Sequence, residues 1–214
     1  MIFACPRTGT TVIQKMIELE FNTSNLVEPF NDPGLKLDPI YVQTEDLYEW
    51  VKKQKTCTMK LLATNLALVD VDRLLAHGNF DRIVVVERKN LTDCCVSLCL
   101  AEKQSKYHYM ENETVNIDPF ECSSEFVTGW INMYRQYVIA LEKITHSGVP
   151  CDTICYEDFM NDQPQQVADV ELQLSKMNIK ILDQSKKTVA LNLPYQDLCI
   201  NYHNVEETIR KALC

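Results

Sequence analysis

An uninterrupted apolar run, Ile-Val-Val-Val at residues 83–86, constrains the fold of this chain more than any other segment. A strand with β-branched side chains at every position is buried on both faces, which is typical of parallel sheets covered by helices. Residues 2–5, 56–63 and 153–156 are also short and apolar, so we expect them to be strands of the same sheet. The sequence therefore predicts an α/β fold with a mainly parallel central sheet.

Segments with helical spacing of apolar residues separate and follow these strands. One helix is predicted from Thr10 to about residue 20, and another begins after Asn90, an N-cap residue with Asp93 three places on. Further helices are expected near 163–176 and 204–213. A long helix carries one apolar stripe, which we interpret as core rather than as a cofactor site: Phe126, Trp130, Tyr134, Tyr137, Leu141 and Ile144. This order of elements predicts a single domain, residues 1–214, folded as a three-layer sandwich.

Composition narrows the class of function. Acidic residues outnumber basic ones 30 to 21, for a formal net charge of −9. Such a surface repels phosphate backbones and anionic lipid, so we expect neither a nucleic-acid partner nor a membrane partner. No apolar run approaches the roughly 18 residues that a membrane helix needs. The opening residues lack the basic leader of a secretion signal, so we expect a cytoplasmic location.

Ten cysteines are many for such a chain, but their spacing does not indicate a metal site or a disulfide framework. No Cys-x-x-Cys occurs, and Cys95 and Cys99, which share a helix face, have no histidine nearby. We interpret the cysteines as small buried apolar residues and predict no metal site.

The segment 5–11, Cys-Pro-Arg-Thr-Gly-Thr-Thr, lies between the first predicted strand and the first predicted helix. Loops at the carboxyl ends of parallel strands hold ligands, and backbone N–H groups at a helix start attract anions. Gly9 lets the backbone approach a ligand closely, Thr10 and Thr11 add hydroxyl donors, and Arg7 supplies a cation. The segment predicts a phosphate-binding strand-loop-helix.

This loop differs from the ATP-binding loop, which requires Gly-x-x-x-x-Gly-Lys-Ser/Thr. If Gly9 is aligned with the second glycine, Ala4 stands at the first glycine and Thr10 at the lysine. A magnesium-bound triphosphate needs that lysine at the helix start. An arginine ahead of the glycine can instead contact a phosphate or sulfate ester from the side of the loop. The alternative is an ordinary loop arginine beside helix-capping threonines.

A second candidate anion site follows the strand at 83–86. Arg88 and Lys89 come directly after this strand, and Ser97 lies on the next predicted helix, on the same face as Asn90 and Asp93. Two cations and a hydroxyl can bind a phosphate. Basic residues after strands are common, so a solvated surface is an equal alternative.

Together these sites resemble the sulfotransferases that use 3′-phosphoadenosine 5′-phosphosulfate (PAPS). Residues 6–11 are similar to the family's first loop, which holds the 5′-phosphosulfate; Arg88 and Ser97 are similar to its 3′-phosphate site. Tyr156-Glu157-Asp158-Phe159 resembles the family's Tyr-Glu-Asp-Leu. The order holds over residues 1–160. The family's adenine-stacking aromatic residue and late glycine-rich loop have no clear counterpart.

The resemblance implies a PAPS-dependent enzyme that needs no metal and transfers a sulfuryl group to a hydroxyl acceptor. Arg7 would be the catalytic cation at the leaving oxygen, and Thr8, Gly9, Thr10 and Thr11 would cradle the phosphate. Arg88 precedes Ser97 by nine residues and Lys89 by eight; either could bind the 3′-phosphate, and we favour Arg88.

For the general base the resemblance favours Glu28, with His108 in reserve. A saccharide or a small hydroxyl metabolite is the favoured acceptor, ahead of a tyrosine-bearing peptide. The alternatives are a kinase or other nucleotide-binding enzyme with an altered loop, and a catalytically silent anion-binding protein of the same fold. The sequence leaves the oligomeric state open.

Overall fold

A computed structural model describes most of the regions in which strands and helices are expected. The described residues are 1–10, 13–14, 17, 24–25, 45–53, 57–105, 117–160 and 194–213. Within them the chain is an α/β protein with a four-stranded sheet in the order β4-β1-β5-β6 and a separate two-stranded sheet, β2-β3. The helix expected near 163–176 lies outside the described residues.

Every pair of neighbouring strands in both sheets is parallel, as the continuous apolar runs predict. The strands of the larger sheet are β1 (Ile2–Ala4), β4 (Lys60–Leu62), β5 (Ile83–Glu87) and β6 (Cys151–Cys155). The expected strand at 56–63 is divided between β3 (Cys57–Thr58), which pairs with β2 (Ser24–Asn25), and β4. β6 begins two residues earlier than expected, at Cys151.

Side chains on the larger sheet alternate between two apolar clusters, one on each face. Phe3 lies level with Leu61 and Val85, and all three belong to the larger cluster, which includes residues of the helices. Ile2, Ala4, Leu62, Val84, Val86 and Ile154 form the second cluster with Ile13. Burial on both faces explains why these strands read as uninterrupted apolar runs.

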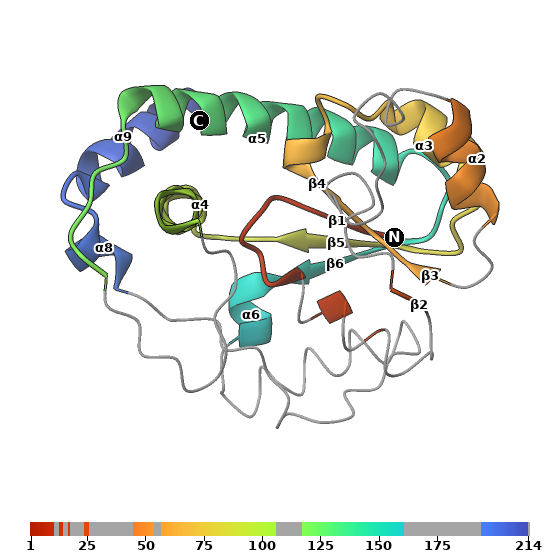
Figure 1. Cartoon of the computed structure of the whole chain (residues 1–214), viewed down its shortest axis with the longest axis horizontal. Coiled ribbons are helices and arrows are strands. Elements are labelled where there is room, and N and C mark those ends of the chain that lie inside the picture. Colours follow the sequence, from red (N-terminus) through yellow and green to blue (C-terminus); the bar gives the residue numbers. More distant parts are fainter. Residues whose placement is uncertain are drawn as a thin grey trace.

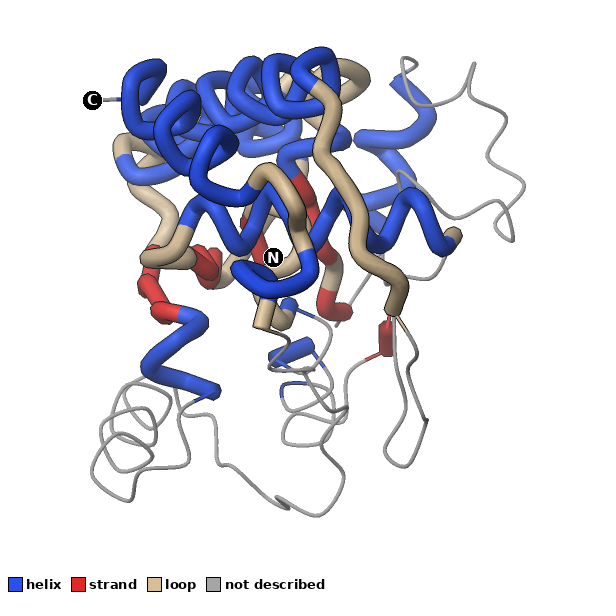
Figure 2. The backbone as a smooth tube through the Cα atoms, turned by 90° about the vertical axis from the view of Figure 1, so that its left-hand side faces the viewer, coloured by secondary structure: helices blue, strands red, loops and turns tan. Residues whose placement is uncertain are grey.

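α4 and α5 lie over the side of the sheet that carries the larger cluster, where most helices gather (Figures 1 and 2), whereas α6 lies on the other side (Figure 1). The elements are α2 (Glu45–Lys53), α3 (Val71–His77), α4 (Leu91–Gln104), α5 (Ser124–Thr145), α6 (Tyr156–Met160), α8 (Tyr195–Leu198) and α9 (Tyr202–Leu213). Residues 10, 13, 14 and 17 are also helical, within the first expected helix. As expected, α4 begins after an Asn90 cap, whose side chain accepts a hydrogen bond from the N–H of Asp93 at 3.0 Å.

The apolar stripe of α5 is core, which confirms the interpretation from the sequence. Trp130, Tyr137 and Ile144 are buried, and the ring of Tyr137 stacks on that of Phe3 in β1 with 4.9 Å between centroids. Burial raises the pKa of Tyr137 above its usual range. This stacking joins α5 directly to the central sheet.

The cysteines of α4 are buried, as expected for small apolar residues. Burial raises the pKa of the Cys94 thiol to about 11, so the thiol stays protonated at neutral pH. Within the described residues all cysteines are free thiols, and no group of three or more His, Cys, Asp or Glu side chains could hold a metal ion. In the same part of the chain, no helix combines the length and apolarity needed to cross a membrane.

Candidate functional site

The loop after β1 and the loop after β5 lie at one edge of the sheet, because the two strands are parallel neighbours. The α4 helix starts at this edge, and α6 follows β6 there (Figure 1). Three segments that the sequence singled out separately therefore meet: residues 5–10, residues 88–97 and residues 156–158. The carboxyl edge of a parallel sheet is the place where α/β proteins bind ligands.

The loop after β1 contains two residues with left-handed backbone, Arg7 at φ 68° and Gly9 at φ 71°. For Arg7 this conformation costs about 1–2 kcal/mol, so the surrounding contacts must hold it in place. The Cys94 thiol donates to the carbonyl of Pro6 at 3.1 Å, and Arg88 Nη1 donates to the carbonyl of Arg7 at 2.9 Å. Residues of α4 and of the β5 loop thus support the strained conformation.

Four carbonyl oxygens of this loop, those of Cys5, Pro6, Arg7 and Gly9, are hydrogen-bonded within the protein. In addition to those of Pro6 and Arg7, the Cys5 carbonyl accepts from Thr8 Oγ1 at 2.9 Å, and the Gly9 carbonyl accepts from the N–H of Ile13 at 3.3 Å. Carbonyl oxygens repel anions, whereas N–H groups at a helix start attract them. Because these carbonyl oxygens bond inward, the loop presents fewer acceptors that would repel an anionic ligand.

Gly9 occupies a position that no other residue fits well. A Cβ atom at Gly9 would lie 2.9 Å from two ring carbons of Tyr156, closer than real Cβ contacts allow. The left-handed φ adds to this cost for any side chain. The Tyr156 ring also lies under the guanidinium of Arg88, with 4.7 Å between Cζ and the ring centroid. Tyr156 therefore packs against both the first loop and the second cation.

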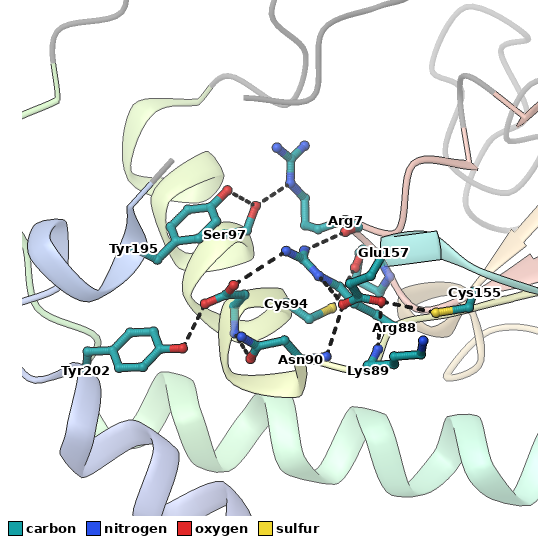
Figure 3. A network of polar contacts seen from close by, with 12 residues as sticks. Arg7, Arg88, Lys89, Asn90, Cys94, Ser97, Cys155, Glu157, Tyr195 and Tyr202 are labelled. Carbon is teal, nitrogen blue, oxygen red and sulfur yellow. Dashed lines mark hydrogen bonds and ion pairs between the residues drawn. The ribbon is translucent and has the colours of Figure 1, made fainter. Parts of the chain in front are cut away.

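The side chains of Arg7 and Ser97 contact each other across 90 residues of sequence (Figure 3). Arg7 Nε donates to Ser97 Oγ at 3.1 Å, and Tyr195 Oη donates to the same oxygen at 2.9 Å. The terminal nitrogens of Arg7 point away from Ser97. The structure thus brings together the cation of the first predicted anion site and the hydroxyl of the second.

Arg88 is enclosed by the protein, with 9% of its side chain exposed. Its Nε lies 3.5 Å from Glu157 Oε1, and its Nη2 lies 4.0 Å from Asp93 Oδ2. Lys89, the other candidate for the second anion site, is 65% exposed and pairs with Asp158 at 2.6 Å. Of the two cations, Arg88 contacts the first loop and Lys89 extends to α6.

The carboxylate of Glu157 caps the start of the segment that leads into α4. Its two oxygens accept hydrogen bonds from the N–H groups of Lys89 at 2.9 Å and Asn90 at 3.0 Å. Partial burial acts to raise the pKa of Glu157, but the hydrogen bonds from Asn90 and Lys89 outweigh it and hold the pKa below its ordinary value of 4.5. The carboxylate is therefore ionised at neutral pH and offsets the charge of Arg88.

The remaining predicted residues divide into two groups. Thr8 is buried and its hydroxyl donates within the loop, while Thr10 is buried at the first helical position. Thr11, Glu28 and His108 lie outside the described residues.

Sequence reasoning missed two tyrosines of the site and the role of one glutamate. Tyr195 bonds to Ser97 from 98 residues away, and Tyr202 Oη donates to Asp93 Oδ1 at 2.8 Å from 109 residues away. Neither tyrosine lies in a motif, so no local signal could have identified it. Glu157 stands in the Tyr-Glu-Asp segment, but its role as a cap for Lys89 and Asn90 depends on the folded structure.

The arrangement sets a guanidinium beside a hydroxyl, a pair of groups suited to an anionic ester, and Arg88, Cys94 and Tyr156 contact the loop that carries the guanidinium. No protein-family model matches the chain, and no curated protein matches it.

Proposed function

We propose that this protein is a sulfotransferase that moves the sulfuryl group of PAPS to a hydroxyl acceptor, and that residues 1–214 form one three-layer domain with a phosphate-binding strand-loop-helix. The observation that carries the proposal is the 3.1 Å hydrogen bond between Arg7 and Ser97. It joins the two motifs whose resemblance to PAPS-dependent enzymes is otherwise a matter of sequence. A donor with a 5′-phosphosulfate and a 3′-phosphate on one ribose needs two neighbouring anion sites.

In this proposal the loop after β1 binds the 5′-phosphosulfate. Arg7 stabilises the negative charge that develops on the leaving phosphate oxygen, and the N–H groups of Thr8, Gly9, Thr10 and Thr11 cradle the phosphate. The hydrogen-bonded carbonyls of Cys5, Pro6, Arg7 and Gly9 support this role, because the acceptors that would repel an anion are bonded elsewhere.

Ser97 and Arg88 are proposed for the 3′-phosphate. Ser97 is next to Arg7, and Arg88 donates to the backbone of the same residue. Arg88 is preferred to Lys89 because the Lys89 ammonium pairs with Asp158 and points to α6. Arg88 then has two tasks in the proposal: it supports the left-handed Arg7, and it binds the 3′-phosphate while Glu157 and Asp93 offset part of its charge.

The transfer breaks the bond between sulfur and the phosphate oxygen and forms a bond between sulfur and the acceptor oxygen, whose proton goes to a base. Glu28 is proposed as that base, with His108 in reserve, and the acceptor is a saccharide or a small hydroxyl metabolite. PAPS supplies the activated sulfuryl group, so the chain's own tasks are to bind, align and neutralise charge. The proposal requires no metal and places the enzyme in the cytoplasm.

A thermal-shift experiment with adenosine 3′,5′-bisphosphate, the desulfated product, tests the proposal. At about a hundred times its Kd this ligand adds about 2.7 kcal/mol to the free energy of unfolding, which is measured as a raised Tm. ATP with Mg²⁺ serves as the comparison ligand. Stabilisation by ATP–Mg²⁺ alone would favour a kinase. Stabilisation by the bisphosphate without sulfuryl transfer from PAPS to any hydroxyl acceptor would favour a silent binding protein.

A further inference from the structure

Tyr195, at the start of α8, is joined to the candidate site through one hydrogen bond. Its side chain is buried, and its Oη lies 2.9 Å from Ser97 Oγ in α4 (Figure 3). Ser97 is buried as well, with 4% of the residue exposed. A buried hydroxyl whose hydrogen-bond partners are fixed has a defined direction in which it can donate.

The hydrogen-bonding capacity of Ser97 determines what this contact does. A serine hydroxyl has one hydrogen to donate and two lone pairs that accept. Arg7 Nε donates to one lone pair and Tyr195 Oη to the other. With both acceptor positions filled, the remaining capacity of Ser97 is to donate its own hydrogen. Two donors pointing at this oxygen also make it a stronger donor in turn, because hydrogen bonds in a chain polarise one another.

We propose that Tyr195 is a positioning residue of the anion site: its hydroxyl, together with Arg7, makes Ser97 a donor toward an oxygen of a bound phosphate or sulfate ester. This inference rests on the proposed function only for the identity of the ligand. That the ligand is an oxyanion which accepts hydrogen bonds does not depend on the proposed function. Any tetrahedral oxyanion that binds beside Arg7 and Ser97 accepts hydrogen bonds and donates none at its ionised oxygens.

The segment that carries Tyr195 is anchored firmly enough for this task. The Tyr195 carbonyl accepts from the N–H of Cys199 at 2.8 Å, and the backbones of Phe120 and Ile200 are hydrogen-bonded at 2.8 Å. In α9, Tyr202 bonds to Asp93, one helical turn before Ser97 on α4. The C-terminal helices thus contact two successive turns of the site-bearing face of α4.

A double-mutant cycle on Tyr195→Phe and Ser97→Ala separates positioning from packing. The dissociation constant of adenosine 3′,5′-bisphosphate is measured by calorimetry for the wild type, each single variant and the double variant. We expect Tyr195→Phe to weaken binding about tenfold, the size of one lost hydrogen bond to a charged ligand network. In the Ser97→Ala background, Tyr195→Phe should have no further effect, because the oxygen that it orients is gone.

Tyr48→Phe is the matched control. Tyr48 is also buried and its hydroxyl also makes one hydrogen bond, from the N–H of Asp70 at 3.2 Å, but α2 lies at the opposite end of the molecule (Figure 1). The control should lower the Tm and leave the affinity unchanged. Wild-type affinity in Tyr195→Phe, or the same loss in both Ser97 backgrounds, overturns the inference.

The cycle is repeated with inorganic sulfate, so that failure of the inference and failure of the proposed function give different results. If sulfate shows the non-additive pattern and the bisphosphate does not bind, Tyr195 positions Ser97 and the proposed donor is wrong. If the bisphosphate binds and the two substitutions are additive, the donor stands and the positioning role is wrong. If the wild type binds neither probe, both proposals are wrong.

Discussion

The loops after β1 and β5 have the same topology, but the protein bonds to the backbone carbonyls of the first loop and to the backbone N–H groups of the second. Each follows a buried parallel strand, leads into a helix and carries an arginine. In the first loop, the carbonyls of Pro6 and Arg7 accept hydrogen bonds from the protein. In the second, the N–H groups of Lys89 and Asn90 donate to the Glu157 carboxylate, so the protein itself supplies an anion there.

This contrast assigns different work to two arginines that look alike in the sequence. The charge of Arg88 is offset by Glu157 and Asp93, and its guanidinium supports the first loop. Arg7 takes its support through its backbone carbonyl and directs its side chain to a neutral hydroxyl. The second loop, through Arg88, therefore stabilises the left-handed backbone of Arg7 in the first loop.

The largest expected effect of this contrast is on catalysis. Arg7→Ala should lower sulfuryl transfer by about 10³-fold or more, because a cation at the leaving oxygen acts mainly in the transition state. Lys89→Ala is the comparison, since its ammonium pairs with Asp158 on the surface, and its rate should fall by no more than about tenfold. Transfer from PAPS to hydroxyl acceptors is the measurement. Equal losses in the two variants would contradict the different roles of the two loops.

Removal of the protein's own anion should have the next largest effect. Glu157→Ala leaves Arg88 with one carboxylate fewer and two N–H groups unbonded, so we expect unfolding in urea to require about 2–3 kcal/mol less free energy. Added sulfate should restore part of the loss by binding at the emptied corner. A variant of wild-type stability, or one that sulfate stabilises no more than it stabilises the wild type, would show that the corner is not an anion site.

A smaller effect is expected from the glycine that shapes the first loop. Gly9→Ala should cost about 2 kcal/mol, because the Cβ atom meets the Tyr156 ring and the backbone is left-handed. Gly148 is the matched control: its φ is 79° and a Cβ atom there would have no neighbouring atom within 4 Å, so Gly148→Ala should cost only about 1 kcal/mol. Urea denaturation of both variants gives the difference. Equal costs would show that the contact with Tyr156 is not restrictive.

The pH dependence of stability should show the smallest of these effects. The folded-state pKa of Glu157 lies below its ordinary value of 4.5. The ionised carboxylate therefore contributes fully to the free energy of unfolding above pH 4.5, and this contribution is lost as the pH falls through the folded-state pKa. Glu157→Gln should flatten this part of the acid limb when the free energy of unfolding is measured from pH 6 downward. A variant with an unchanged acid limb would mean that other carboxyl groups account for it.

The features predicted correctly from the sequence are local ones. The strands β1 and β5 and the Asn90 cap of α4 follow from residues that are adjacent in the chain, because burial on both faces and capping each leave a short pattern. The short helices α2 and α3 were not predicted. The cysteines of α4 could be interpreted correctly as small buried residues, because their spacing suggests no metal site and no histidine stands near them in the sequence.

The amino-acid sequence by itself determined the parallel sheet, the loop at its edge and the identity of the cation in that loop. Only the tertiary structure decided the strand order, the enclosure of Arg88 by Glu157 and Asp93, and the contact of Tyr195 with Ser97. The physical reason is distance along the chain. A helix, a strand or a cap depends on neighbours a few residues away, whereas a hydrogen bond between groups 98 residues apart leaves no periodic pattern in the sequence.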